Sequence, residues 1–301
     1  APTLTITTPI EGDDVVNATE DVDVLVEGTT DAETGQIVTV TFTDGASATV
    51  TAEAAVSEGG WSLSGSEADI SGLEEGEITV TANVSDAAGN AATEASATVT
   101  LDNSAPTIEI TPGIAGDDVV NASEDEDVLV EGATDAEDGQ IVTVTFTDSA
   151  DATVTATATV SEGGWSLNGS GTDISALANG EITVTANVSD AAGNPAPEAS
   201  ATATLDNTVD IPTINPGITD QGNTVSGTGE PGATVSVSIM SDGVSEPVGS
   251  AVVWTDGTWS FVADTPIADG ATLHAVQQDA AGNFSLEASQ VTFTDTDGDG
   301  T

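Results

Sequence analysis

Apolar and polar residues alternate along most of the chain. In residues 78–84 the apolar positions are Ile78, Val80, Ala82 and Val84, and each residue between them is polar. A period of two is typical of a β-strand with one buried face. The same pattern predicts strands at residues 4–6, 22–26, 38–42, 48–52, 61–63, 78–84 and 97–101. Turn-forming Gly, Asp and Asn separate these strands and no helical pattern interrupts them, so we predict an all-β fold of antiparallel β-sandwiches.

The pattern repeats along the chain. Residues 1–104 align without a gap with residues 105–208 at roughly 78% identity, and residues 209–301 form a shorter, diverged unit. All three units share a Trp-Ser pair, at Trp61, Trp165 and Trp259. We therefore predict three tandem Ig-like domains in an extended array, with boundaries at 1–104, 105–208 and 209–301. We expect the recurring Trp residues to be core residues.

The charge is extreme. The chain has 52 Asp and Glu, no Lys or Arg, one His and a net charge of −52. Such a chain repels nucleic acids and anionic membranes, so both are excluded as direct partners. Without Cys, Lys, Arg or Tyr it lacks the usual groups for nucleophilic and acid–base catalysis, and we expect no enzyme. No cation of the protein offsets the carboxylates, which predicts that metal ions or salt do so. We expect a monomer whose partners are its own neighbouring domains.

The sequence Asp-Ala-Ala-Gly-Asn recurs three times between the last two strands of a unit. These DAAGN loops are Asp86–Asn90, Asp190–Asn194 and Asp279–Asn283. In a seven-stranded sandwich, this loop, the loop after the second strand (31–35 and 135–139) and the incoming linker lie at the same end. Acids from two domains therefore meet at each junction. Asp and Asn supply the oxygen ligands that Ca²⁺ prefers, although the same residues also form turns.

We predict calcium sites at both junctions. The expected ligands of the first are Asp102, Asn103, Asp135, Glu137, Asp190 and Asn194, and those of the second are Asp206, Asn207, Asp279 and Asn283. A second acidic cluster lies after the first strand, at Asp13, Asp14, Asn17, Glu20 and Asp21, and again at Asp117, Asp118, Asn121, Glu124 and Asp125. Asn followed three residues later by Glu also caps a helical turn, so metal site and cap both stay open here. Asp295, Asp297 and Asp299 have the spacing that opens an EF-hand-type loop, but the later bidentate acid is not in the sequence, so we favour an acidic linker here.

Several segments resemble a known family. GDDVVNATEDVDV from Gly12, GDDVVNASEDEDV from Gly116 and ITVTANVSDAAGN from Ile78 look like the tandem Ig-like repeats of giant secreted bacterial adhesins with RTX-type ends. In the third unit, SGTGEPGATVSVSI from Ser226 and DGTWSF from Asp256 resemble another bacterial Ig-like module of such proteins. The resemblance implies type I secretion, a location outside the cell at the bacterial surface, and Ca²⁺ at the domain junctions.

Two functions follow as hypotheses. The first is a structural extender that projects a distal binding domain in cell adhesion or biofilm formation, with Ca²⁺ as its stiffener. The alternative is a glycan-binding or partner-binding module in the third unit, around Trp254, which has no counterpart in the other units. An exposed aromatic patch confined to the third unit would favour the alternative. The single histidine, His274, falls at a strand position that we expect to face solvent.

Overall fold

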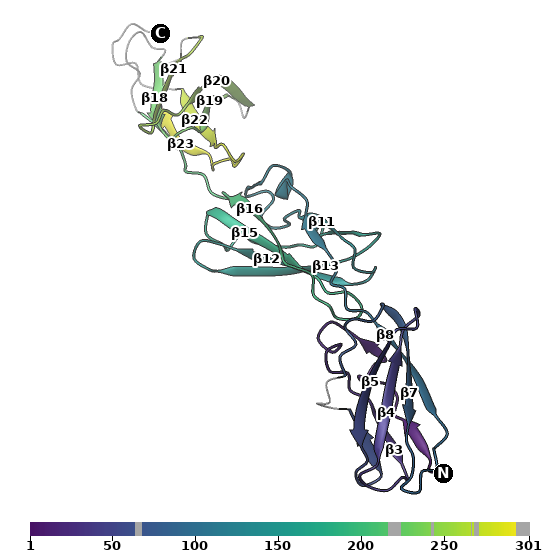
Figure 1. The fold of residues 1–301 in the computed structure, drawn as a ribbon. Coiled ribbons are helices and arrows are strands. Elements are labelled where there is room, and N and C mark those ends of the chain that lie inside the picture. Colours follow the sequence, from purple (N-terminus) through teal and green to yellow (C-terminus); the bar gives the residue numbers. More distant parts are fainter. Residues whose placement is uncertain (64–67, 216–223, 242–243, 266, 268–270, 293–301) are drawn as a thin grey trace.

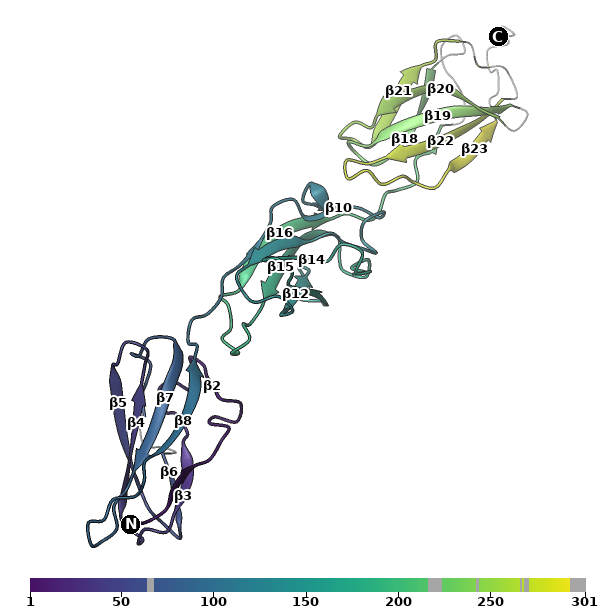
Figure 2. The ribbon, with the colours of Figure 1, turned by 90° about the vertical axis from the view of Figure 1, so that its right-hand side faces the viewer.

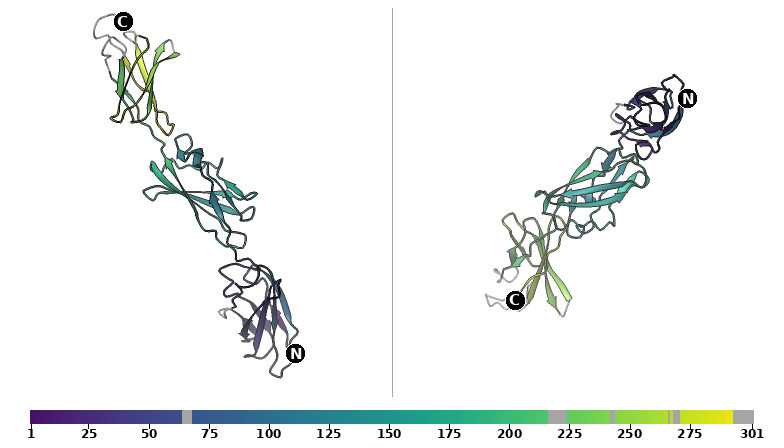
Figure 3. Two further views of the ribbon diagram at one scale, coloured as in Figure 1. Left: turned by 45° about the horizontal axis from the view of Figure 1, so that its top comes forward. Right: turned by 90° about the horizontal axis from the view of Figure 1, so that it is seen from below.

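The computed structural model describes residues 1–301 except 64–67, 216–223, 242–243, 266, 268–270 and 293–301. Three β-sandwiches follow one another end to end, as three viewing directions show (Figures 1, 2 and 3). Each sandwich has its own hydrophobic core. The prediction of an all-β protein made of tandem Ig-like sandwiches is confirmed. No helix in the described part of the chain is long and apolar enough to cross a membrane.

In the first sandwich, a three-stranded sheet packs against a five-stranded sheet. The small sheet has the order β1-β3-β6, from Leu4–Ile6, Glu27–Thr30 and Gly60–Ser62. The large sheet has the order β2-β8-β7-β4-β5, from Val15–Val16, Ala95–Leu101, Gly76–Asn83, Ile37–Thr43 and Thr49–Ala55. All pairs are antiparallel except β2 with β8, which are parallel.

The second sandwich repeats this arrangement. Its small sheet is β14-β11-β9, from Gly164–Ser166, Glu131–Thr134 and Ile108–Ile110, and a short 3₁₀ helix follows at Ile114–Gly116. Its large sheet is β10-β16-β15-β12-β13, from Val119–Val120, Ala199–Leu205, Gly180–Asn187, Ile141–Thr147 and Thr153–Thr159. The shared architecture follows from the near-identical sequences.

The third sandwich keeps the two-sheet design with fewer strands described. One sheet is β17-β18-β21, from Thr213–Ile214, Thr224–Thr228 and Thr258–Val262. The other is β20-β19-β22-β23, from Val244–Val252, Thr234–Ser241, Thr272–Gln278 and Ala288–Thr292. Register shifts in two of its strand pairs break the regular ladder.

The recurring Trp residues are core residues, as predicted. Trp61 is 4% exposed, and its indole lies directly over Gly28 on β3, the neighbouring strand of the same sheet. A Cβ on Gly28 would come within 2.5 Å of the indole and 2.0 Å of the Thr5 carbonyl oxygen. The same close approach recurs at Gly132 under Trp165 and at Gly227 under Trp259. Glycine is therefore required at the position of the neighbouring strand over which the indole ring lies.

Three details differ from the prediction. The second strand spans Glu27–Thr30 and not 22–26. Residues 17–23 form turns, and although Val24 and Val26 reach the core, the regular ladder begins only where Gly28 passes beneath Trp61. The short strands β2 and β10 were not expected, because a two-residue apolar pair carries no visible period.

His274 was predicted to face solvent and is instead 7% exposed. The pairing of β22 with β23 shifts between Leu273 and Ala275, so that three consecutive side chains are buried and the two-residue alternation is lost. The His274 Nδ1 atom contacts the Glu287 carboxylate.

Candidate metal centres at the domain junctions

Each DAAGN loop is a tight turn built around its own aspartate. In the second domain, Asp190 Oδ1 accepts a hydrogen bond from the Asn194 backbone N–H at 2.7 Å, and Asp190 Oδ2 accepts one from Asn194 Nδ2 at 2.9 Å. Gly193 has φ +92°, a left-handed conformation that glycine adopts without strain. Asp86 and Asp279 make the corresponding bonds in the other loops. The local sequence therefore sets the loop shape in all three domains.

The DAAGN loops of the second and third domains lie against the preceding domain. Asn194 is 2% exposed and Asn283 is 6% exposed, whereas Asn90 in the first domain is exposed. Asp190 and Asp279 are likewise buried, at 8% and 9%. Because the loops share one sequence, the difference in burial comes from the neighbouring domain. The strand order had predicted this placement.

Four carboxylates meet at the first junction. An open pocket there is lined by Asp102 of the linker, Asp135 and Glu137 of the 135–139 loop, and Asp190 of the DAAGN loop. Asp135 Oδ1 accepts a hydrogen bond from the Thr107 N–H. Glu137 Oε2 accepts one from the Ala191 N–H at 2.9 Å, which ties the two loops together. All four residues were predicted as ligands, and they line one open pocket.

The electrostatics of this pocket are unfavourable without a cation. Burial raises the pKa of the Asp102 carboxyl, and the charges of Asp190, Glu75 and Glu137 raise it further. Like charges that face each other in a partly desolvated site disfavour ionisation. A divalent cation placed among them would remove that repulsion. Glu75, from the turn before β7, is a member of this cluster that was not predicted.

The second junction has the same character with different residues. Burial raises the pKa of Glu230, and the charges of Asp279, Asp206 and Asp210 raise it further. Asp206 and Asp279 were predicted as ligands, whereas Glu230 and Asp210 were not. The Gly229–Gly232 loop is short, and only the fold shows that it brings Glu230 close to Asp206, Asp210 and Asp279. The acidic side chain of Glu230 in that short loop was the sequence feature from which its place in the cluster could have been predicted.

Asn103 and Asn207 turn away from the junctions. Asn103 Nδ2 donates to Asp21 Oδ2 at 2.7 Å, and Asn207 Nδ2 donates to Asp125 Oδ2 at 2.8 Å. Both amides therefore bind the domain that precedes the linker. Asn194 and Asn283 lie in the junctions, where their amide groups are engaged in hydrogen bonds described below.

The second acidic cluster forms a cap. Asn17 Oδ1 accepts from the Thr19 N–H at 2.9 Å, and Glu20 Oε2 accepts from the Asn17 N–H at 3.0 Å. The bond from Asn17 to Glu20 is that of a capping box, whereas the Asn17 oxygen caps the second N–H of the turn and not the third. Asn121 and Glu124 repeat them in the second domain.

The paired aspartates before these caps bind their own backbone. Asp14 Oδ1 accepts from the Ile10 N–H at 2.8 Å, and Asp13 Oδ1 accepts from the Val15 N–H at 3.0 Å. Asp117 and Asp118 do the same in the second domain. Asp295, Asp297 and Asp299 lie outside the described residues. Within the described part of the chain, no three His, Cys, Asp or Glu side chains already converge as ligands of one metal ion.

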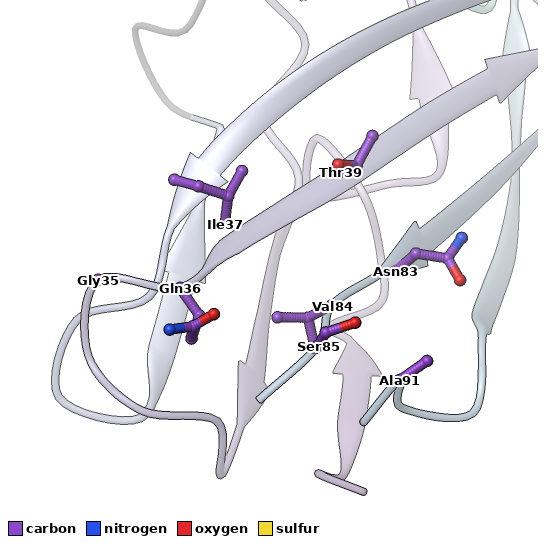
Figure 4. A pocket seen from close by; sticks show the side chains of 8 residues that line it. All are labelled: Gly35, Gln36, Ile37, Thr39, Asn83, Val84, Ser85 and Ala91. Carbon is purple, nitrogen blue, oxygen red and sulfur yellow. The ribbon is translucent and has the colours of Figure 1, made fainter. Parts of the chain in front are cut away.

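Two other pockets among the described residues contain no carboxylates. Figure 4 shows the residues that line one of them in the first domain, among them Gln36, Thr39 and Asn83 with Ile37 and Ala91. No side chain that lines it is ionisable, and an equivalent pocket in the second domain has the same character. The carboxylate donor sets at the junctions, which contain oxygen and neither nitrogen nor sulfur, fit a hard cation such as Ca²⁺.

Known proteins resemble the chain in part and as a whole. Residues 212–295 match the bacterial Ig domain family. A tetra-tandem repeat from the extending region of a large adhesion protein is 30% identical, over 97% of this chain and 74% of that one, with a TM-score of 0.34. The chain belongs to the tandem Ig-like repeats of large bacterial adhesins. The assignment rests on the sequence identity along nearly the whole chain and not on the superposition.

Other adhesin repeats agree with this assignment. An adhesin of an Antarctic bacterium, described as Ca²⁺-stabilized and as helping the bacterium reach out and bind ice, is 30% identical over 97% of this chain and 74% of that one, with a TM-score of 0.46. Part of a 1.5-MDa bacterial ice-binding adhesin is 26% identical over 98% of both chains, with a TM-score of 0.40. No curated protein matches the chain. Adhesin repeats of this kind are structural and not enzymatic.

Proposed function

We propose that this chain is an extender segment outside the bacterial cell, in which Ca²⁺ bound at the domain junctions stiffens the array and so projects a distal binding domain. The observation that carries the proposal is the meeting of carboxylates from two domains in a chain with no Lys or Arg. Asp102, Asp135, Glu137 and Asp190 would hold the ion at the first junction. Asp206, Asp210, Glu230 and Asp279 would hold it at the second.

The chemistry of the ion explains why stiffness would depend on it. Ca²⁺ takes six to eight oxygen ligands, and extracellular modules bind it with Kd values of about 10⁻⁴ to 10⁻³ M. An ion held by the linker and by two loops of the next domain restrains rotation of one domain against the other. In its absence the carboxylates repel each other. We infer a monomer that contacts neither nucleic acid nor membrane and that is secreted by the type I route.

Calorimetric calcium titration tests this proposal. The chain should bind Ca²⁺, and Asp190→Asn should lose one site, because it removes a carboxylate from the first junction. Calcium stoichiometry is the readout and not melting temperature, since the substitution also removes one of the two Asp190 oxygens that accept from Asn194. Asp86→Asn is the matched control, since Asp86 has the same loop position but no linker aspartate beside it. Equal calcium stoichiometry in wild type and Asp190→Asn would refute the assignment.

A second candidate function has one observation in its favour. Among the described residues, large aromatic side chains are exposed only in the third domain, where Trp254 is 53% and Phe284 is 69% exposed. Trp254 follows Val252 by two residues. Across the paired strands, Val252 lies opposite Thr234, Thr234 opposite Gln278, and Gln278 opposite Phe284, so Phe284 is three strand spacings away from Val252. At about 4.8 Å per strand, this separation prevents one continuous aromatic patch. Loss of glycan binding in Trp254→Ala would support this alternative.

A further inference from the structure

The last asparagine of each junction loop connects three separate segments. Asn194 Oδ1 accepts a hydrogen bond from the Ala18 N–H of the first domain at 2.8 Å. Asn194 Nδ2 donates to the Asp102 carbonyl oxygen of the linker at 2.8 Å and to Asp190 Oδ2 of its own loop at 2.9 Å. The amide group therefore has a partner for both of its N–H bonds and for its oxygen. A neutral side chain joins the two domains directly.

The first domain presents a group that needs such a partner. Residues 17–21 form a capped turn, whose other N–H groups bond inside the turn: Thr19 donates to Asn17 Oδ1, and Glu20 and Asp21 donate to the Asn17 carbonyl. The Ala18 N–H is the one that bonds outside, to Asn194. The first N–H groups of a helical turn lack partners within the turn. The neighbouring domain thus completes the cap.

The second junction shows the same arrangement independently. Asn283 Oδ1 accepts from the Ala122 N–H at 2.7 Å, and Asn283 Nδ2 donates to the Asp206 carbonyl oxygen at 2.7 Å. Ala122 lies in a turn that is capped like the first one. The third domain is diverged elsewhere, and the asparagine contact is the same in both junctions.

The first domain shows what the loop does alone. The Asn90 side chain donates only to Asp86, and it is exposed. The Asp86–Asn90 turn nevertheless closes as the Asp190–Asn194 turn does, with the asparagine N–H donating to the aspartate carboxylate. The turn forms without a neighbour, so the asparagine is already placed when the domains meet.

We propose that Asn194 and Asn283 are latches, which fix the orientation of each domain on the preceding one by capping its turn with a neutral amide. This contact goes beyond the calcium proposal, because its bonds across the junction are made with uncharged backbone groups and operate with or without the ion. Asn194 and Asn283 were predicted from the sequence as calcium ligands, and the latch gives their amides a different role.

Distances between spin labels in the first two domains test the latch. The chain has no cysteine, so Glu53→Cys and Thr157→Cys, on exposed strand positions, place one label in each domain. In saturating Ca²⁺ the wild type should give one narrow distance peak. Asn194→Ala should give a broader distance distribution than the wild type in Ca²⁺, and a broader one than the wild type in chelator, whereas the matched Asn90→Ala should equal the wild type in both conditions.

A variant in the other domain guards against simple misfolding of the loop. Ala18→Pro removes the N–H that Asn194 accepts from, at a first-turn position that tolerates proline. It should widen the distance distribution as Asn194→Ala does, and the double variant should be no worse than either one. A narrow peak for Asn194→Ala in Ca²⁺ would overturn the latch. A wild-type peak that is indifferent to Ca²⁺ would refute the calcium proposal and leave the latch standing.

Discussion

The contact between Gly28 and Trp61 provides a quantitative test of the fold. Gly28→Ala places a methyl group 2.0 Å from the Thr5 carbonyl oxygen and 2.5 Å from the Trp61 ring, whereas Cβ atoms keep at least 3.0 Å from other atoms. Strand β1, which carries Thr5, must therefore move away by 1.0 Å or more, and the indole must shift as well. Backbone blocks one side and a buried ring blocks the other, so neither adjustment is free.

The expected cost is at the upper end of overpacking effects. Extra methyl groups in a packed core cost about 1–3 kcal/mol, and we expect about 3 kcal/mol here. For a domain of roughly 100 residues, each kcal/mol lowers Tm by about 4–8 °C, so the first domain should melt on the order of 12–24 °C lower. Scanning calorimetry measures this loss, and hydrogen exchange in residues 27–30 and 60–63 assigns it to the first domain.

Gly72→Ala is the control in the same domain. Nothing lies within 4 Å of a Cβ at Gly72, and the second domain has Ala176 at the equivalent position. This variant should change the free energy of unfolding by less than about 0.5 kcal/mol. If Gly28→Ala lowered the free energy of unfolding as little as Gly72→Ala, the contacts of Trp61 and Thr5 with Gly28 would not explain the need for glycine at this position.

Two further predictions concern charge. Because the folded state holds the Asp102 proton more tightly than the unfolded state, stability in chelator should fall as pH rises above the ordinary Asp value of 3.8 toward the raised folded pKa, and Asp102→Asn should flatten this dependence in melting curves. Hydrogen bonds from the backbone of Ala178, Ala152 and Ala150 lower the pKa of Asp148, so its contribution is present above pH 3.8 and is lost as pH falls through the lowered folded pKa. Asp148→Ala should therefore lower Tm at pH 7 and have less effect on Tm in strong acid. An unchanged Tm at pH 7 would refute the stabilising role of that carboxylate.

The fold followed from local patterns. Alternation in segments such as 38–42 and 78–84, and the near-identity of two units, predicted tandem sandwiches with DAAGN loops facing the previous domain. What failed depended on pairing with distant segments. The bulge that buries His274 and the short parallel strand at Val15–Val16 arise from partners in other strands, and no periodicity within a few residues reveals them.

The candidate sites were predictable by residue type more than by role. Asp102, Asp135, Glu137 and Asp190 meet because the strand order brings their loops to one end of the domain. The hydrogen-bond partner of each asparagine could not be predicted in this way. Asn103 turns back to its own domain and Asn194 reaches across to Ala18, and each choice depends on groups that are far away in the sequence. Glu230 joins the second cluster because the fold places its short loop beside Asp206, Asp210 and Asp279.

Small-angle scattering with and without millimolar Ca²⁺, with melting curves on the same samples, tests the central claim most directly. If calcium at the junctions stiffens the array, the chain should scatter as an extended rod in Ca²⁺, become more flexible in chelator, and gain melting temperature as Ca²⁺ rises. If the scattering curve and the melting temperature are the same in both conditions, the junction carboxylates do not hold a stiffening ion and the calcium account is wrong.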